Sequence, residues 1–161
     1  MKFIGFKING VLWKSSTIFL LFLSIASCSS RVVYDDVVAV DGEVWDLNDK
    51  VRLEFNVNDT TNTNLFFVHV RNKTTYRYSN LYLFMQTRFP NGNITKDTIE
   101  CVLADPSGKW LGKGSGPYRE NMILLNASLK FPLKGTYVMD IEQAMRDGKL
   151  DGITDVGIRI E

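Results

Sequence analysis

The sequence contains few of the residues on which catalytic and metal sites most often depend. Its 161 residues include two cysteines and one histidine. Two cysteines allow at most one disulfide, and a single histidine cannot supply the repeated imidazole ligands of a typical zinc centre. The histidine, His69, stands in an apolar stretch, and no Gly-x-Ser-x-Gly nucleophile motif accompanies it. We therefore interpret His69 as a strand residue whose hydrogen-bonding groups are satisfied, and we expect no catalytic residue, metal or cofactor.

An excess of charge of one sign is also missing. The 19 basic and 18 acidic residues give a formal charge of +1 at pH 7. Proteins that bind nucleic acid present a strongly basic face, so this balance argues against nucleic acid as a partner. A permanent membrane-spanning helix is missing as well, because it needs about 20 apolar residues, whereas the apolar run at residues 18–23 is far shorter.

The amino terminus has the features of an export signal. Three lysines and no acidic residue occur among the first 14 residues, and the apolar run at residues 18–23 follows. A charged start, a short apolar centre and small residues at the cut are typical of a secretory signal peptide. Residues 25–28 (Ile-Ala-Ser-Cys) also fit the lipobox, in which an aliphatic residue and two small residues precede a cysteine that is acylated before cleavage.

We therefore predict that residues 1–27 are a cleaved lipoprotein signal peptide and that Cys28 carries lipid, with palmitate among its acyl chains. The alternative is an ordinary signal peptide with an incidental cysteine. Residues 28–161 would form one domain with a formal charge of −2, because three lysines leave with the signal peptide. Cys101 would then be the one free thiol, and its place in an alternating apolar run predicts a buried core position.

Most of the remaining chain has the two-residue period of β-strands. Val51, Leu53, Phe55 and Val57 alternate with polar residues, as one buried strand face would. The same reasoning predicts strands over residues 65–70, 81–89, 94–103, 122–125, 137–141 and 156–160. Residues 141–146 contain good helix formers and are followed by Asp-Gly, which predicts one short helix near the C-terminus. The fold class predicted is all-β, a single antiparallel β-sandwich of the jelly-roll or immunoglobulin-like type.

Two glycine-containing segments are interpreted as turns. Residues 90–93 (Pro-Asn-Gly-Asn) predict a tight connection between two strands. Residues 108–116 superficially resemble a phosphate-binding loop, but only three residues separate the first glycine from Gly112-Lys113, where the motif needs four. We interpret this stretch as a loop that needs glycine dihedral angles, with Trp110 packed beneath it.

One connection is a candidate partner-binding loop. The polar, basic and aromatic stretch of residues 71–80 joins two strongly apolar runs, and it includes Arg71, Tyr76, Arg77 and Tyr78. Loops held by a rigid scaffold often carry binding residues, and Tyr and Arg are favoured in interface hot spots. The alternative is that the two tyrosines simply cover the end of the sandwich.

Laid out in this way, the chain resembles the gliding-motility lipoprotein family GldH over nearly all of residues 28–161. The stretches that carry the resemblance are residues 64–72 (NLFFVHVRN), 78–83 (YSNLYL), 89–92 (FPNG), 97–100 (DTIE), 108–114 (GKWLGKG), 119–121 (REN), 141–146 (IEQAMR) and 152–161 (GITDVGIRIE). The resemblance implies a lipoprotein of the gliding machinery that accompanies the type IX secretion apparatus. It implies no enzymatic activity, and it assigns the lipid to Cys28.

We accordingly expect a non-enzymatic envelope protein that binds other gliding or secretion proteins and takes no small-molecule substrate. Ser29 follows the lipidated cysteine in place of an aspartate that would retain the protein in the inner membrane. We therefore expect the periplasmic face of the outer membrane. The rival interpretation is an envelope carbohydrate-binding module, for which exposed aromatic residues would form a platform. The candidate residues for that platform are Tyr34, Trp45, Tyr76, Tyr78 and Tyr118.

Overall fold

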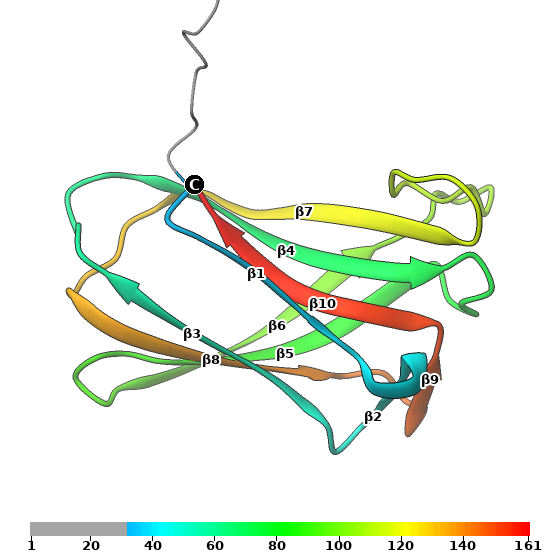
Figure 1. Cartoon of the computed structure of the whole chain (residues 1–161), viewed down its shortest axis with the longest axis horizontal. Coiled ribbons are helices and arrows are strands. Elements are labelled where there is room, and N and C mark those ends of the chain that lie inside the picture. The colour runs from blue at the N-terminus through cyan, green and yellow to red at the C-terminus, as the bar shows by residue number, and fades with distance from the viewer. Residues whose placement is uncertain (1–31) are drawn as a thin grey trace, which may run out of the picture. The chain divides into compact units, whose positions relative to one another are not determined.

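The computed structural model describes residues 32–161, and these residues are almost entirely strands and connections (Figure 1). In chain order the elements are β1 (Tyr34–Ala39), the 3-10 turn η2 (Asp41–Glu43), β2 (Val44–Asp46), β3 (Lys50–Val57), β4 (Asn64–Lys73), β5 (Asn80–Arg88), β6 (Ile94–Val102), β7 (Tyr118–Leu129), β8 (Gly135–Gln143), β9 (Lys149–Asp151) and β10 (Ile153–Ile160). Within this range no helix has the length and apolar character needed to cross a bilayer.

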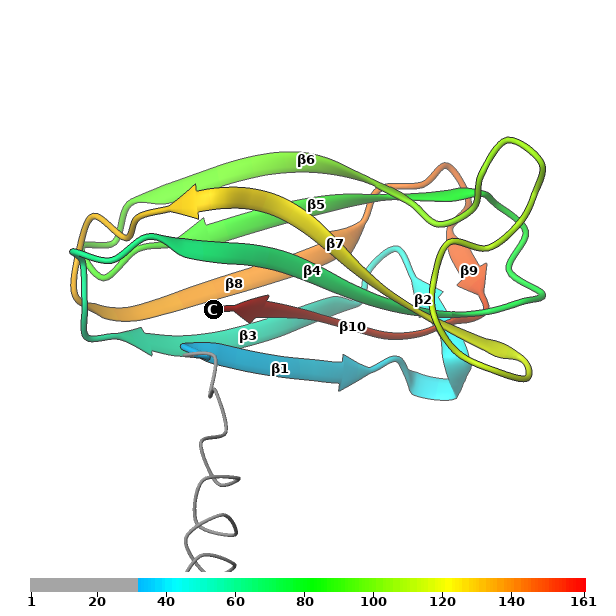
Figure 2. The ribbon, with the colours of Figure 1, turned by 90° about the horizontal axis from the view of Figure 1, so that it is seen from above.

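The strands form two four-stranded antiparallel sheets that pack face to face. One sheet has the order β1-β10-β4-β7 and the other has the order β3-β8-β5-β6, while β2 and β9 form a small pair at one end. Figure 2 shows β6 and β7 along one edge of the sandwich and β1 and β3 along the other. The predicted antiparallel β-sandwich is therefore confirmed.

Alternating apolar residues supply the core between the sheets. The four apolar residues of β3 point inward and are buried, as their two-residue period predicts. Strand β4 lies between β10 and β7, and its inward-facing Val68 and Val70 are fully buried. The predicted turn at residues 90–93 joins β5 to β6, with Gly92 at a φ of 86°. Cys101 is buried as predicted, and burial raises the pKa of its thiol to about 12.

An aromatic cluster fills the end of the core opposite the β4–β5 connection. The Tyr137 ring stacks on Phe55, with centroids 5.6 Å apart, and it meets Phe89 and Phe131 edge to face at 5.3 and 5.1 Å. The Tyr137 hydroxyl donates to the Leu133 carbonyl oxygen at 2.9 Å, so its polar atom is satisfied although the ring is buried. Such aromatic pairs add to the stabilisation from burial alone.

The short helix predicted at residues 141–146 is wrong, because its first three residues belong to β8. Ile141 pairs with Val51 on β3 and with Met85 on β5, and its side chain is fully buried. The alternation of buried and less buried positions continues to Gln143. The Gln143 side-chain amide donates to the Asp147 carbonyl oxygen at 2.9 Å and accepts from the Met145 backbone N–H at 2.8 Å. Strand pairing and the two hydrogen bonds of the Gln143 side chain therefore outweigh the local helix propensity.

An ion pair on the outer face of β3 and β8 gives an expectation about acid stability. Asp140 is buried, and the Arg52 guanidinium donates two hydrogen bonds to it at 2.6 and 2.9 Å. These bonds lower the pKa of the Asp140 carboxyl, so their stabilisation is present above the ordinary carboxylate range and is lost as pH falls through the folded-state pKa. We expect Arg52→Ala to lower the urea midpoint at pH 7 and to have much less effect near pH 3. Lys50→Ala, which removes a more exposed pair with Glu142 on the same strands, is the control and should have the smaller effect at pH 7.

Candidate functional site

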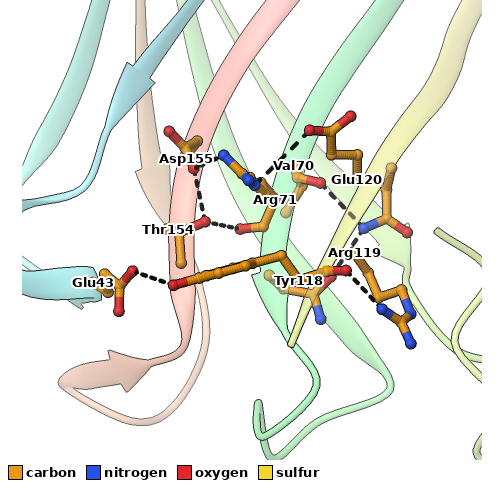
Figure 3. A network of polar contacts seen from close by, with 10 residues as sticks. Glu43, Val70, Arg71, Tyr118, Arg119, Glu120, Thr154 and Asp155 are labelled. Carbon is orange, nitrogen blue, oxygen red and sulfur yellow. Dashed lines mark hydrogen bonds and ion pairs between the residues drawn. The ribbon is translucent and has the colours of Figure 1, made fainter. Parts of the chain in front are cut away.

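A network of charged and polar side chains occupies the end of the sandwich at which β4 finishes (Figure 3). Arg71 on the central strand β4 lies opposite Glu120 on β7 and opposite Asp155 on β10. Its guanidinium is 3.9 Å from the Glu120 carboxylate and 3.8 Å from the Asp155 carboxylate. Strand register thus places one cation between two acidic side chains that are distant in the sequence.

Arg71 also lies over an aromatic ring. Its guanidinium carbon is 4.9 Å from the centroid of the Tyr118 ring, which is within the range of a cation–π contact. The buried Nε of Arg71 makes no hydrogen bond in the described residues, while 39% of the side chain is exposed. The Arg71 charge is therefore balanced by its neighbours, but the guanidinium retains donors that reach the surface.

The Tyr118 hydroxyl connects this arginine to a second ion pair. It donates to Glu43 at 3.2 Å, and Glu43 also accepts from the Lys73 ammonium group. The Lys73 hydrogen bond lowers the pKa of Glu43, and the same bond raises the pKa of Lys73. Both side chains therefore stay charged throughout the neutral range, and the end of the sandwich presents a fixed pattern of paired charges.

Buried amides hold the strands beneath the network in register. Asn121 donates to the Val70 carbonyl oxygen at 3.1 Å and to the Asn72 side-chain oxygen at 2.9 Å. Asn72 is fully buried and donates in turn to the Lys73 carbonyl oxygen. Gly112 is packed so closely here that a Cβ would come within 2.7 Å of the Asn121 side-chain oxygen. These hydrogen bonds and the close contact at Gly112 hold in place the ends of β4 and β7, which carry Arg71 and Tyr118.

The four residues of the predicted partner-binding loop fall into different environments. Arg71 belongs to strand β4 and to the network, rather than to the connection. Tyr76 is buried, and its hydroxyl donates to the Asn80 carbonyl oxygen, so this side chain covers the end of the sandwich. Tyr78 donates to Asp147 at 2.6 Å, a bond that raises the pKa of Tyr78. Arg77 is 78% exposed and lies 3.9 Å from the same carboxylate.

Glu43 and Asp155 of the network were not predicted from the sequence, whereas Tyr118 was predicted only as a candidate sugar-binding residue. Sheet order brings Tyr118 on β7 and Asp155 on β10 to Arg71, while Glu43 belongs to η2 and is connected to Arg71 through the Tyr118 hydroxyl. In residues 32–161 no group of three or more His, Cys, Asp and Glu side chains is arranged to hold a metal ion. The geometry therefore provides paired charges, free guanidinium donors and an aromatic ring, which are the components of a polar binding surface.

The aromatic platform of the rival interpretation is not assembled. Of its five candidate residues, Trp45 is 1% exposed and Tyr76 is 5% exposed, so neither ring can stack on a sugar. Trp45 instead donates its indole N–H to the Asp49 carbonyl oxygen within the fold. The remaining three tyrosines are half-buried and come from β1, β7 and the β4–β5 connection.

Fold and site together define an antiparallel β-sandwich domain with a charged surface at one end. The family model described as GldH lipoprotein matches residues 32–160, and the chain belongs to this family. The gliding motility lipoprotein GldH homolog of Christiangramia forsetii is 37% identical over 155 residues, which cover 90% of this chain and 94% of the relative. The gliding motility lipoprotein GldH of Flavobacterium johnsoniae is 35% identical over 156 residues, which cover 92% of this chain and 96% of the relative.

Proposed function

We propose that the protein is a non-enzymatic, lipid-anchored component of the gliding-motility apparatus and that it also serves the associated type IX secretion machinery. The observation that carries the proposal is the match to the GldH lipoprotein family over residues 32–160, together with two relatives named for gliding motility. Cys28 bears the lipid after removal of residues 1–27. The anchored domain faces the periplasm from the outer membrane.

The mechanism is protein binding by a tethered rigid domain. A lipid anchor confines the sandwich to two dimensions and raises its effective concentration near partners in the same membrane. The end of the sandwich with Arg71 and the exposed Arg77 supplies the contact surface. A partner with carboxylate or carbonyl oxygens would complement their unused guanidinium donors. The buried Asn72 and Asn121 amides hold the strands beneath this surface in place. This supports the proposal, because side chains that are already ordered lose less conformational freedom on binding.

Charge reversal tests the contact surface. We expect the double variant Arg71→Glu, Arg77→Glu to retain about a tenth or less of the wild-type co-purified partner protein, because opposed charges at an interface weaken binding strongly. The measurement is cross-linking followed by affinity purification from the host. Lys96→Glu with Lys134→Glu, which reverses two exposed charges elsewhere, is the matched control and should leave recovery unchanged. Equal partner recovery from both double variants, each with a normal melting temperature, would remove this surface from the proposal.

Deletion of the gene tests the role in motility and secretion. We expect the deletion strain to lose spreading on agar and to release less protein into the medium, and we expect the wild-type gene to restore both. Loss of spreading with normal secretion would limit the function to motility. Normal spreading and normal secretion would contradict the proposal as a whole.

A further inference from the structure

A cavity of about 450 Å³ lies between the two sheets at the end opposite the Arg71 network. Its open side is lined by residues of β6 and of β7, which are edge strands of the two facing sheets. Its walls are mainly apolar and aromatic. The principal lining residues are Phe55, Phe66, Met85, Phe89, Leu125 and Leu129. The volume falls in the range of small-molecule sites, about 300–1,000 Å³.

The inner faces of the two sheets are less completely covered toward this end. On β6 the inward-facing positions change from fully buried Cys101 to half-buried Ile99 and then to exposed Asp97 and Thr95. Across the gap, register shifts interrupt the pairing of β4 with β7 on both sides of Phe66. Residues on the inner face of β6, which the facing sheet would cover in a closed sandwich, therefore line the opening of the cavity.

The chemistry of the lining selects an apolar, flexible ligand. The Tyr137 hydroxyl, which is the polar atom of the aromatic cluster, is already hydrogen-bonded to the Leu133 carbonyl oxygen. The charged lining residues, Asp97 and Lys130, are exposed. A ligand inside the cavity would therefore make mainly apolar contacts. At the mouth, the exposed Lys130 ammonium group could bind an anionic group of the same ligand.

The cavity also lies close to where the described chain begins. The Val33 amide donates to the Ile160 carbonyl oxygen at 2.8 Å, and Ile160 lines the cavity. Phe131 lines both the cavity and a small cleft formed by Val32 and Val33. Cys28 precedes Val32 by four residues, and four residues of extended chain span at most about 14 Å. A lipid on Cys28 would therefore hold this end of the sandwich near the bilayer, with the cavity mouth at the same end but on the edge away from β1.

We infer that this cavity binds one acyl chain of a phospholipid from the membrane that holds the protein. The inference rests on the proposed lipid anchoring at Cys28, which supplies the bilayer as a neighbouring source of acyl chains. The tail enters between β6 and β7 and packs on the half-buried Phe66, Phe89 and Leu125 side chains, and the phosphate remains at the mouth beside Lys130.

Photo-cross-linking of the full lipid-modified protein tests the inference. The protein is reconstituted into phosphatidylethanolamine vesicles that contain some phosphatidylethanolamine with a diazirine at the end of one acyl chain. After irradiation we expect adducts on peptides that contain Met85, Leu125 or Leu129. Thr95→Trp, at an exposed position on the rim, should reduce these adducts by about tenfold. Thr98→Trp on the opposite face of β6 is the matched control and should leave them unchanged.

Each other outcome overturns a defined part of the inference. A protein that floats with the vesicles but gains no cavity adducts contradicts the acyl-chain site and leaves the anchoring intact. A protein that does not float contradicts the anchoring and the inference together. In cells fed a photoactivatable fatty acid, a link between the cavity peptides and the amino-terminal lipopeptide would identify the protein's own anchor as the occupant, which would overturn the assignment to a phospholipid.

Discussion

Replacement of Gly157 by alanine is expected to destabilise the domain by about 3 kcal/mol or more, at the upper end of what overpacking costs. Gly157 lies on β10, with Val37 of β1 on one side and His69 of β4 on the other. A Cβ at this position would overlap the Asp36 carbonyl oxygen and come within 2.7 Å of the Val37 Cα. Both are backbone atoms, so the clash cannot be relieved by turning a side chain, and β1 must move away from β10.

Urea unfolding of Gly157→Ala against the wild type measures this effect. Gly148→Ala is the matched control, because no atom lies within 4 Å of an added Cβ there. We expect the control to stay within about 0.5 kcal/mol of the wild type. Equal unfolding midpoints for the two variants would show that β1 does not pack on β10 as described.

Truncation of Tyr137 to alanine is expected to cost about 4 kcal/mol, the range observed when a buried aromatic ring is removed. The ring is 1% exposed and contacts three other aromatic rings. Its loss would join the space left behind to the existing cavity, so the surrounding side chains cannot easily fill it.

Tyr137→Phe separates the ring from the hydroxyl. It keeps the aromatic packing and removes the two hydrogen bonds with the Leu133 backbone, at 2.9 and 3.3 Å. We expect a loss of about 1 kcal/mol, the typical net value of such bonds. Thermal and urea unfolding measure both variants. A Tyr137→Phe cost as large as that of Tyr137→Ala would place the main contribution in the hydroxyl and contradict the aromatic cluster as the source of stability.

The fold could be predicted from the sequence wherever one strand face is buried and the other is solvated. Strand β3 is the simplest case, because its alternation maps directly onto burial. The ends of β7 could not be predicted in this way. This edge strand covers Tyr118–Leu129, but it carries polar Asn126 and Ser128 near one end and exposed Met122 and Leu124 in its middle. The alternation of apolar and polar residues is weak along this edge strand. Its ends are determined by its pairing with the one neighbouring strand, β4.

The candidate site was only partly predictable for a related reason. Arg71 was recognised from its residue type and its place in a polar, basic and aromatic stretch between two apolar runs, whereas its partners depend on sheet order. Tyr118 was predicted only as a candidate sugar-binding residue, and no role was predicted for Glu43. His69 is a β4 strand residue as predicted, but the prediction that its hydrogen-bonding groups are satisfied is wrong for Nδ1, which has no hydrogen-bond partner among residues 32–161. Non-local pairing, not composition, determines these contacts.

Complementation of the deletion strain tests whether a lipid-anchored sandwich acts in gliding. The deletion strain is complemented with either the wild-type gene or Cys28→Ala, and spreading on agar is scored after immunoblotting confirms that both proteins accumulate. We expect full spreading with the wild type and none with Cys28→Ala. Full spreading with Cys28→Ala would contradict the claim that the lipid anchor is required.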